Sequence, residues 1–156
     1  MAENLPEPTG KSGEQARTSS SYIMTFYYNV QDLTHYKSTY KNIILELKNL
    51  YPDMESNIEN SKKMNDEEHT FLIQHAQTLR YYCDVVYTSY QAVCLDLQLP
   101  SNEEVKDAFN KIMNSYIPSA ELIDTFTIQM HHFLLQEIIQ GMLRGGQQLI
   151  ETTFKQ

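Results

Sequence analysis

Residues 72–97 read LIQHAQTLRYYCDVVYTSYQAVCLDL, and apolar or small side chains recur within them at steps of four and three. The positions are Leu72, Ala76, Leu79, Cys83, Val86, Tyr90, Val93 and Leu97. Eight consecutive matches at the helical period cannot belong to a strand, whose side chains alternate every two residues. The spacing therefore predicts a long helix that packs against other helices along its whole length.

The segment before this stretch keeps the same rhythm. Apolar residues follow it at Phe26, Val30, Leu33, Tyr40, Ile44 and Leu47. We expect a first helix from about residue 21 to residue 51, ended by Pro52. Asp32 and Thr34 are both good helix caps, so a break in this helix stays open as an alternative.

The ends of the later helices are marked by capping signals. Asn65 with Glu68 forms a capping box for the central helix, which should run to about residue 98. Ser101 with Glu104 predicts the start of a short third helix. Ser119 should cap a fourth helix that runs to the glycine pair 145–146, and a last helical piece over residues 147–154 stays open.

The chain is therefore predicted to be all-α, a bundle of about four helices of which three are long and one is short. Residues 53–64 are interpreted as the first connection. Residues 1–20 contain two prolines, one leucine and no aromatic residue, and this composition predicts a disordered tail. Residues 21–156 are long enough for one domain with a sizeable core and too short for two.

Charge and cysteine content limit the partners and the compartment. The net charge is −8, and −7 of it falls in residues 53–107, which argues against direct binding to nucleic acid or anionic membranes. The sequence holds no run of 18 apolar residues that could span a membrane. Cys83 and Cys94 lie about 16 Å apart along one helix and cannot form a disulfide there. We expect an intracellular protein, cytoplasmic or nuclear.

We find no motif for catalysis, phosphate binding or metal binding. The sequence contains no Glu-x-x-His pair, no Gly-rich phosphate loop and no Gly-x-Ser-x-Gly turn. A non-enzymatic protein without cofactor or metal is the leading interpretation. The alternative is a small-molecule or metal site inside the bundle, near His75, Cys83 and His131, which could serve an enzyme. A secreted cytokine is disfavoured because the N-terminus has no apolar signal segment.

Two segments, residues 85–95 and 125–136, lack acidic and basic side chains other than histidine. We interpret them as buried on more than one side, which would place the second and fourth helices at the centre of the bundle. The short third helix leaves part of such a bundle uncovered. Soluble proteins usually cover exposed apolar surface with a partner or a second copy.

The sequence thus favours a helical protein–protein interaction module, an adaptor or a regulatory subunit. It would bind an amphipathic helix of a partner in an apolar groove, or form a homodimer through that groove. Tyrosine suits half-buried interface positions, and the sequence has eleven tyrosines. The candidate partner-binding residues are Tyr28, Tyr82, Tyr87, His132 and Gln136.

Overall fold

The computed structural model describes residues 19–54 and 63–155, with side chains for 21–54 and 63–141. It contains four helices: α2 (Ser19–Leu50), α4 (Asp66–Asp96), α5 (Glu103–Asn114) and α6 (Ala120–Lys155). The all-α prediction is confirmed, and so is the contrast between three long helices and a short one. The predicted tail, apart from Ser19 and Ser20, and most of the first connection lie outside the described residues.

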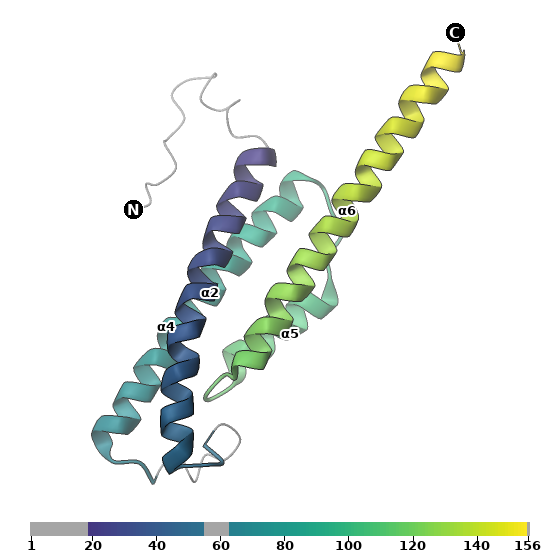
Figure 1. The fold of residues 1–156 in the computed structure, drawn as a ribbon. Coiled ribbons are helices and arrows are strands. Elements are labelled where there is room, and N and C mark those ends of the chain that lie inside the picture. The colour runs from purple at the N-terminus through teal and green to yellow at the C-terminus, as the bar shows by residue number, and fades with distance from the viewer. Residues whose placement is uncertain (1–18, 55–62, 156) are drawn as a thin grey trace, which may run out of the picture.

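The helices form an elongated bundle with one helix that projects from it. Helices α2 and α4 run side by side in opposite directions, and α5 and α6 lie on one side of this pair (Figure 1). Helix α6 has 36 residues, about 54 Å at 1.5 Å per residue. Its C-terminal part extends beyond the ends of the other helices (Figure 1).

The stripe of residues 72–97 forms the spine of the core. All of its members from Leu72 to Val93 are buried, and Leu97 is the half-buried C-cap of α4. The largest fully buried side chains opposite it are Phe26 and Tyr40 of α2 and Phe126 of α6. The stripe is thus covered by α2 along its length and by α5 and α6 on one side.

The capping predictions are confirmed for α4 and α6 and are wrong by one residue for α5. The Asn65 side chain accepts a hydrogen bond from the Glu68 N–H at 2.8 Å, and the Glu68 carboxylate accepts one from the Asn65 N–H. At α5 the N-cap is Asn102, whose side chain accepts from the Val105 N–H at 3.0 Å. Asparagine caps as well as serine does, so Ser101 has a competitor one residue later.

Two predicted interruptions do not occur. Helix α2 runs through residues 32 and 34 without a break, because Leu33 is buried and holds this turn in the core. Helix α6 continues past Gly145 and Gly146 to Lys155. Glycine is a weak helix former, but it keeps the N–H that the helix needs, so it does not end a helix as proline does.

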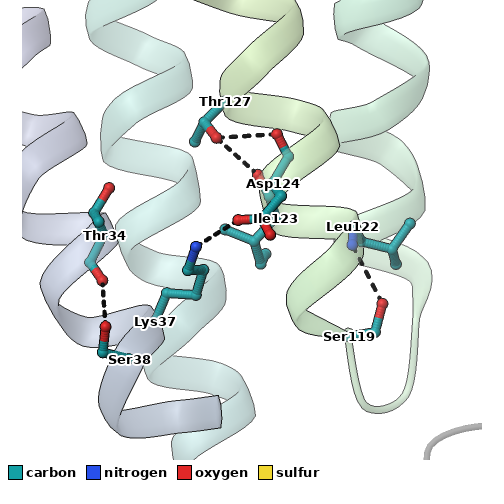
Figure 2. Close-up of polar contacts among 8 residues, drawn as sticks. All are labelled: Thr34, Lys37, Ser38, Ser119, Leu122, Ile123, Asp124 and Thr127. Atoms are coloured by element: carbon teal, nitrogen blue, oxygen red, sulfur yellow. Dashed lines mark hydrogen bonds and ion pairs between the residues drawn. The ribbon is translucent and has the colours of Figure 1, made fainter.

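A few polar contacts fix the end of α6 against α2. Figure 2 shows that Lys37 of α2 forms an ion pair with Asp124 of α6, and that the Ser119 hydroxyl accepts a hydrogen bond from the Leu122 N–H at 3.2 Å. The buried Tyr40 hydroxyl donates to the Pro118 carbonyl at 2.5 Å. These contacts position the start of α6 and direct the helix along α2.

Candidate functional site

The α2–α4 pair has one covered face and one open face. On α4, Tyr87 stacks on Phe109 of α5 at 4.1 Å, whereas Val85 lies two residues earlier, about 200° around the helix. On α2, Tyr27 stacks on His131 of α6 at 5.4 Å. Thr25 lies two residues before Tyr27, which again is about 200° around the helix. Val85 and Thr25 therefore lie on the face of the pair opposite α5 and α6.

This open face contains a groove of about 380 Å³, which we call the α2–α4 groove. Its walls are lined by Ser21, Tyr22, Thr25, Asn29, Asp84, Val85, Thr88, Ser89 and Ala92. Most of these side chains are small, and Asp84 is the one charged residue among the nine. Small side chains let another backbone approach closely, which is the geometry that helix packing requires.

One hydroxyl of the groove lining is already used within its own helix. Ser89 is buried, and its hydroxyl donates to the Val86 carbonyl of the preceding turn at 2.8 Å. The proton of the Ser89 hydroxyl is therefore already donated within α4. The groove can accept an apolar side chain without leaving this hydroxyl unsatisfied.

An aromatic group continues the open face toward the middle of the pair. It consists of Tyr36 of α2 and Phe71, His75 and Tyr82 of α4, and we call it the Tyr36 cluster. Tyr36 stacks on Tyr82 at 5.1 Å, and Phe71 meets the edge of His75 at 4.4 Å.

The cluster and the groove share the same lines of the two helices. Positions 22, 29 and 36 of α2 follow at intervals of seven residues, and so do positions 75, 82 and 89 of α4. Seven residues are close to two helical turns, so the groove and the cluster form one strip along the antiparallel pair.

Burial favours the neutral forms of two polar groups in the Tyr36 cluster. Burial raises the pKa of the Tyr36 hydroxyl and lowers the pKa of the His75 imidazole, because both charged forms lose hydration. The Tyr36 hydroxyl and His75 Nδ1 are 2.5 Å apart and share a hydrogen bond. Besides His75, Asp84 is the one acidic or basic side chain of the strip, whose groove is lined mainly by small residues.

The structure does not bring the five sequence-predicted partner residues together. Tyr82 belongs to the Tyr36 cluster, whereas Tyr87 lies half-buried between α4, α5 and α6. Tyr28 is 58% exposed on α2 and is not among the residues that line the groove. His132 and Gln136 are exposed on α6. Only Tyr82 lies on the strip.

Sequence reasoning missed the residues of the groove itself. The uncharged segment 85–95 was interpreted as buried on several sides, but Thr88 and Gln91 are exposed and Leu95 is 82% exposed. The expectation that this segment is buried on several sides is wrong, because a segment without charged residues can also form an exposed, uncharged surface. Small residues at 85, 88, 89 and 92, spaced as one helix face, were the available signal.

The described residues offer no metal-binding group. No three His, Cys, Asp or Glu side chains within the described ranges are arranged to hold an ion. Burial raises the pKa of the Cys83 thiol to about 12, which leaves almost no thiolate at neutral pH. No helix of the described residues has the combination of length and apolar character needed to cross a membrane.

Comparison of the chain with protein-family models, with curated proteins and with solved structures gives no match.

Proposed function

We propose that this chain is a non-enzymatic helical interaction module, an adaptor or regulatory subunit of an intracellular complex. Its α2–α4 groove would bind an amphipathic helix of a partner protein. The observation that carries the proposal is the open strip formed by the groove and the Tyr36 cluster. A long pair of helices is covered by α5 and α6 on one face, while the opposite face presents small and aromatic side chains.

The lining of the strip defines the chemistry of the partner helix. Small side chains beside Val85 and Ala92 favour a helix that approaches closely with apolar residues at intervals of three and four. The strip contains no lysine or arginine, and Asp84 lies in the groove wall. We therefore expect the partner helix to carry a basic residue beside its apolar face, close to Asp84.

Other functions fit the same surface less well. A phosphate backbone would meet Asp84 and no base in the groove, which disfavours nucleic acid. A small-molecule site usually encloses most of its ligand and offers several converging polar groups. The α2–α4 groove is an open, shallow channel whose polar floor atom, the Ser89 hydroxyl, already donates within its own helix.

The test uses one variant in the groove and one matched control. Thr88→Arg introduces a long cation into the groove, and Gln91→Arg makes the same change in charge on the exposed surface of α4 outside the groove. Proteins that co-purify with the wild-type chain from cells are identified by mass spectrometry. Peptides covering their amphipathic helices are then titrated against the purified chains by calorimetry.

We expect one such peptide to bind the wild-type chain and the Gln91→Arg variant with similar affinity. The Thr88→Arg variant should bind it at least ~10-fold more weakly, because the long arginine side chain would fill the groove and pair with Asp84, four residues earlier on α4. Equal binding to all three chains would refute the groove, and so would failure of every peptide to bind.

A further inference from the structure

The open strip begins at the point where the chain enters α2. Helix α2 starts at Ser19, and Ser21 and Tyr22 line the end of the α2–α4 groove beside this start. Residues 1–18 precede α2 and lie outside the described residues. They are therefore tethered to one end of the strip, and a short tether gives an attached segment an effective concentration in the millimolar range.

The sequence of this segment carries three side chains that suit the strip, at a constant interval. Leu5, Pro8 and Lys11 recur every three residues within LPEPTGK. A polyproline II helix has three residues per turn, so these side chains would share one face of it, and Glu7 would lie on another. Pro6 and Pro8 favour this extended conformation over an α-helix.

The dimensions of the strip match the spacing of these side chains. Asn29 and Asp84 line the end of the groove nearer to the Tyr36 cluster. Along α2, Asn29 lies about 15 Å and Tyr36 about 25 Å beyond Ser19.

The segment has to reverse its direction before it can run back along α2. A four-residue turn over residues 15–18 would achieve this and would place residue 15 beside the start of α2. At about 3.1 Å per residue, Lys11 would then lie about 12 Å and Pro8 about 22 Å along the strip. Lys11 is thereby level with Asp84, and Pro8 with Tyr36, each to within about 3 Å. Leu5 lies about 9 Å further along, toward Phe71.

The chemistry at each of these levels is complementary. Asp84 is the one charged residue of the groove lining, and Lys11 would bring an ammonium group to it. Pro8 would meet the stacked rings of Tyr36 and Tyr82, and Leu5 would meet Phe71, which is 48% exposed. Proline-rich segments bind to aromatic-lined grooves because their extended conformation is already formed.

Polar side chains beside the cluster provide hydrogen bonds for an extended backbone. Tyr81, whose ring contacts that of Tyr82, lines a shallow pocket together with Gln74, Gln77 and Thr78. A polyproline II helix forms no internal hydrogen bonds, so its carbonyl groups need donors. The amide groups of Gln74 and Gln77 can supply them.

We infer that residues 5–17 fold back along the strip as an internal occupant, with Leu5, Pro8 and Lys11 facing Phe71, Tyr36 and Asp84. A partner helix then has to displace this segment before it can bind. This regulatory consequence rests on the proposed function, whereas the contact between the segment and the strip does not.

The test is intramolecular photo-crosslinking in the full chain, with p-benzoylphenylalanine in place of Leu5. An equal mixture of ¹⁴N- and ¹⁵N-labelled chains is irradiated at about 1 µM, so that mass spectrometry separates crosslinks within one copy from crosslinks between copies. We expect most crosslinks within one copy and in the tryptic peptides 18–37 and 64–80, which contain Tyr36 and Phe71.

A pair of charge-reversal variants tests the level of Lys11. Lys11→Glu should lower the yield of these crosslinks on the order of 10-fold, because it would place a second carboxylate opposite Asp84. Lys106→Glu makes the same change at an exposed position of α5 and should leave the yield unchanged. Circular dichroism of both variants reports whether the helices are retained.

The inference is wrong if no crosslink forms, if most crosslinks fall in other peptides or join two copies, or if both folded variants crosslink as the wild-type chain does. A chain that forms the expected crosslinks and binds no partner helix would refute the proposed function alone. A chain that binds a partner helix without these crosslinks would refute this inference alone.

Discussion

Burial keeps the two cysteine thiols of this chain protonated at neutral pH. Cys83 is fully buried in the stripe of α4, and burial raises its pKa to about 12. Cys94 is half-buried, and the same loss of hydration raises its pKa. The thiolate is the reactive form, so both cysteines should be inert in the folded protein.

We predict that Cys83 reacts with a thiol reagent such as dithionitrobenzoate at pH 8 only when the fold opens. A shift in pKa from 9 to about 12 lowers the thiolate fraction ~1,000-fold at that pH, in addition to steric exclusion. A Cys94→Ala variant isolates the Cys83 signal. Reaction of this variant in buffer as fast as in 8 M urea would contradict the prediction.

The two half-buried histidines predict a loss of stability on mild acidification. Burial lowers the pKa of His75 and of His131, and His131 Nε2 is buried with no hydrogen-bond partner among the described residues. The unfolded chain, where histidine titrates near 6.5, then binds protons more readily than the folded chain. The free energy of unfolding should be highest above pH 7 and fall as the pH drops through 6.5.

Urea unfolding at pH 7.5, 6.5 and 5.5 measures this effect, above the range in which most carboxylates titrate. A variant with His75→Gln and His131→Gln should show a smaller decrease between pH 7.5 and 5.5 than the wild-type chain. A free energy of unfolding of the wild-type chain that stays constant or rises between pH 7.5 and 5.5 would contradict the lowered pKa of His75 and His131.

Tyrosine shows how far residue type alone predicts the candidate site. The buried Tyr40 donates to a backbone carbonyl, Tyr87 stacks inside the bundle, and Tyr81 is 63% exposed. All three settings suit a ring with a polar tip. Composition therefore cannot decide which tyrosines could reach a partner, because that depends on which face of the helix α5 and α6 cover.

At the scale of the element, the N-terminus of α4 is held by a reciprocal pair of hydrogen bonds. Asn65→Ala removes the acceptor for the Glu68 N–H and should lower the free energy of unfolding by about 0.5–2 kcal/mol. Urea unfolding measures the change. Asn42→Ala, at an exposed position inside α2, is the matched control and should be neutral or slightly stabilising.

A cost of Asn65→Ala no larger than that of the control would mean that the capping box contributes nothing to the stability of the fold.

The helices themselves were largely predictable, because period and caps are local signals: the α4 stripe and Ser119 were identified correctly. The end of α6 was not predictable from its glycines. Glycine lowers helix propensity without removing the N–H, so the pair 145–146 is compatible with an end of the helix and with its continuation.

At the scale of the whole molecule, uncharged segments of three helices pack together. The stretches without acids or lysine and arginine are residues 19–31, 85–95 and 125–136. They meet in space: the ring of Phe26 lies 6.3 Å from that of Tyr90 and 5.6 Å from that of His131, and Tyr90 lies 6.4 Å from Phe133. The α2–α4 groove is lined mostly by residues of the first two stretches.

The most direct test of the partner-helix groove is site-specific photo-crosslinking from α4. A photoreactive amino acid is placed at Thr88, in the groove, or at Gln91, on the same helix outside it, and the full chain is irradiated in cells. We predict a discrete adduct with another protein at position 88, through residues of one of its helices, and none at position 91. Equal labelling at the two positions, or an adduct at 88 formed only with a second copy of this chain, would contradict the account.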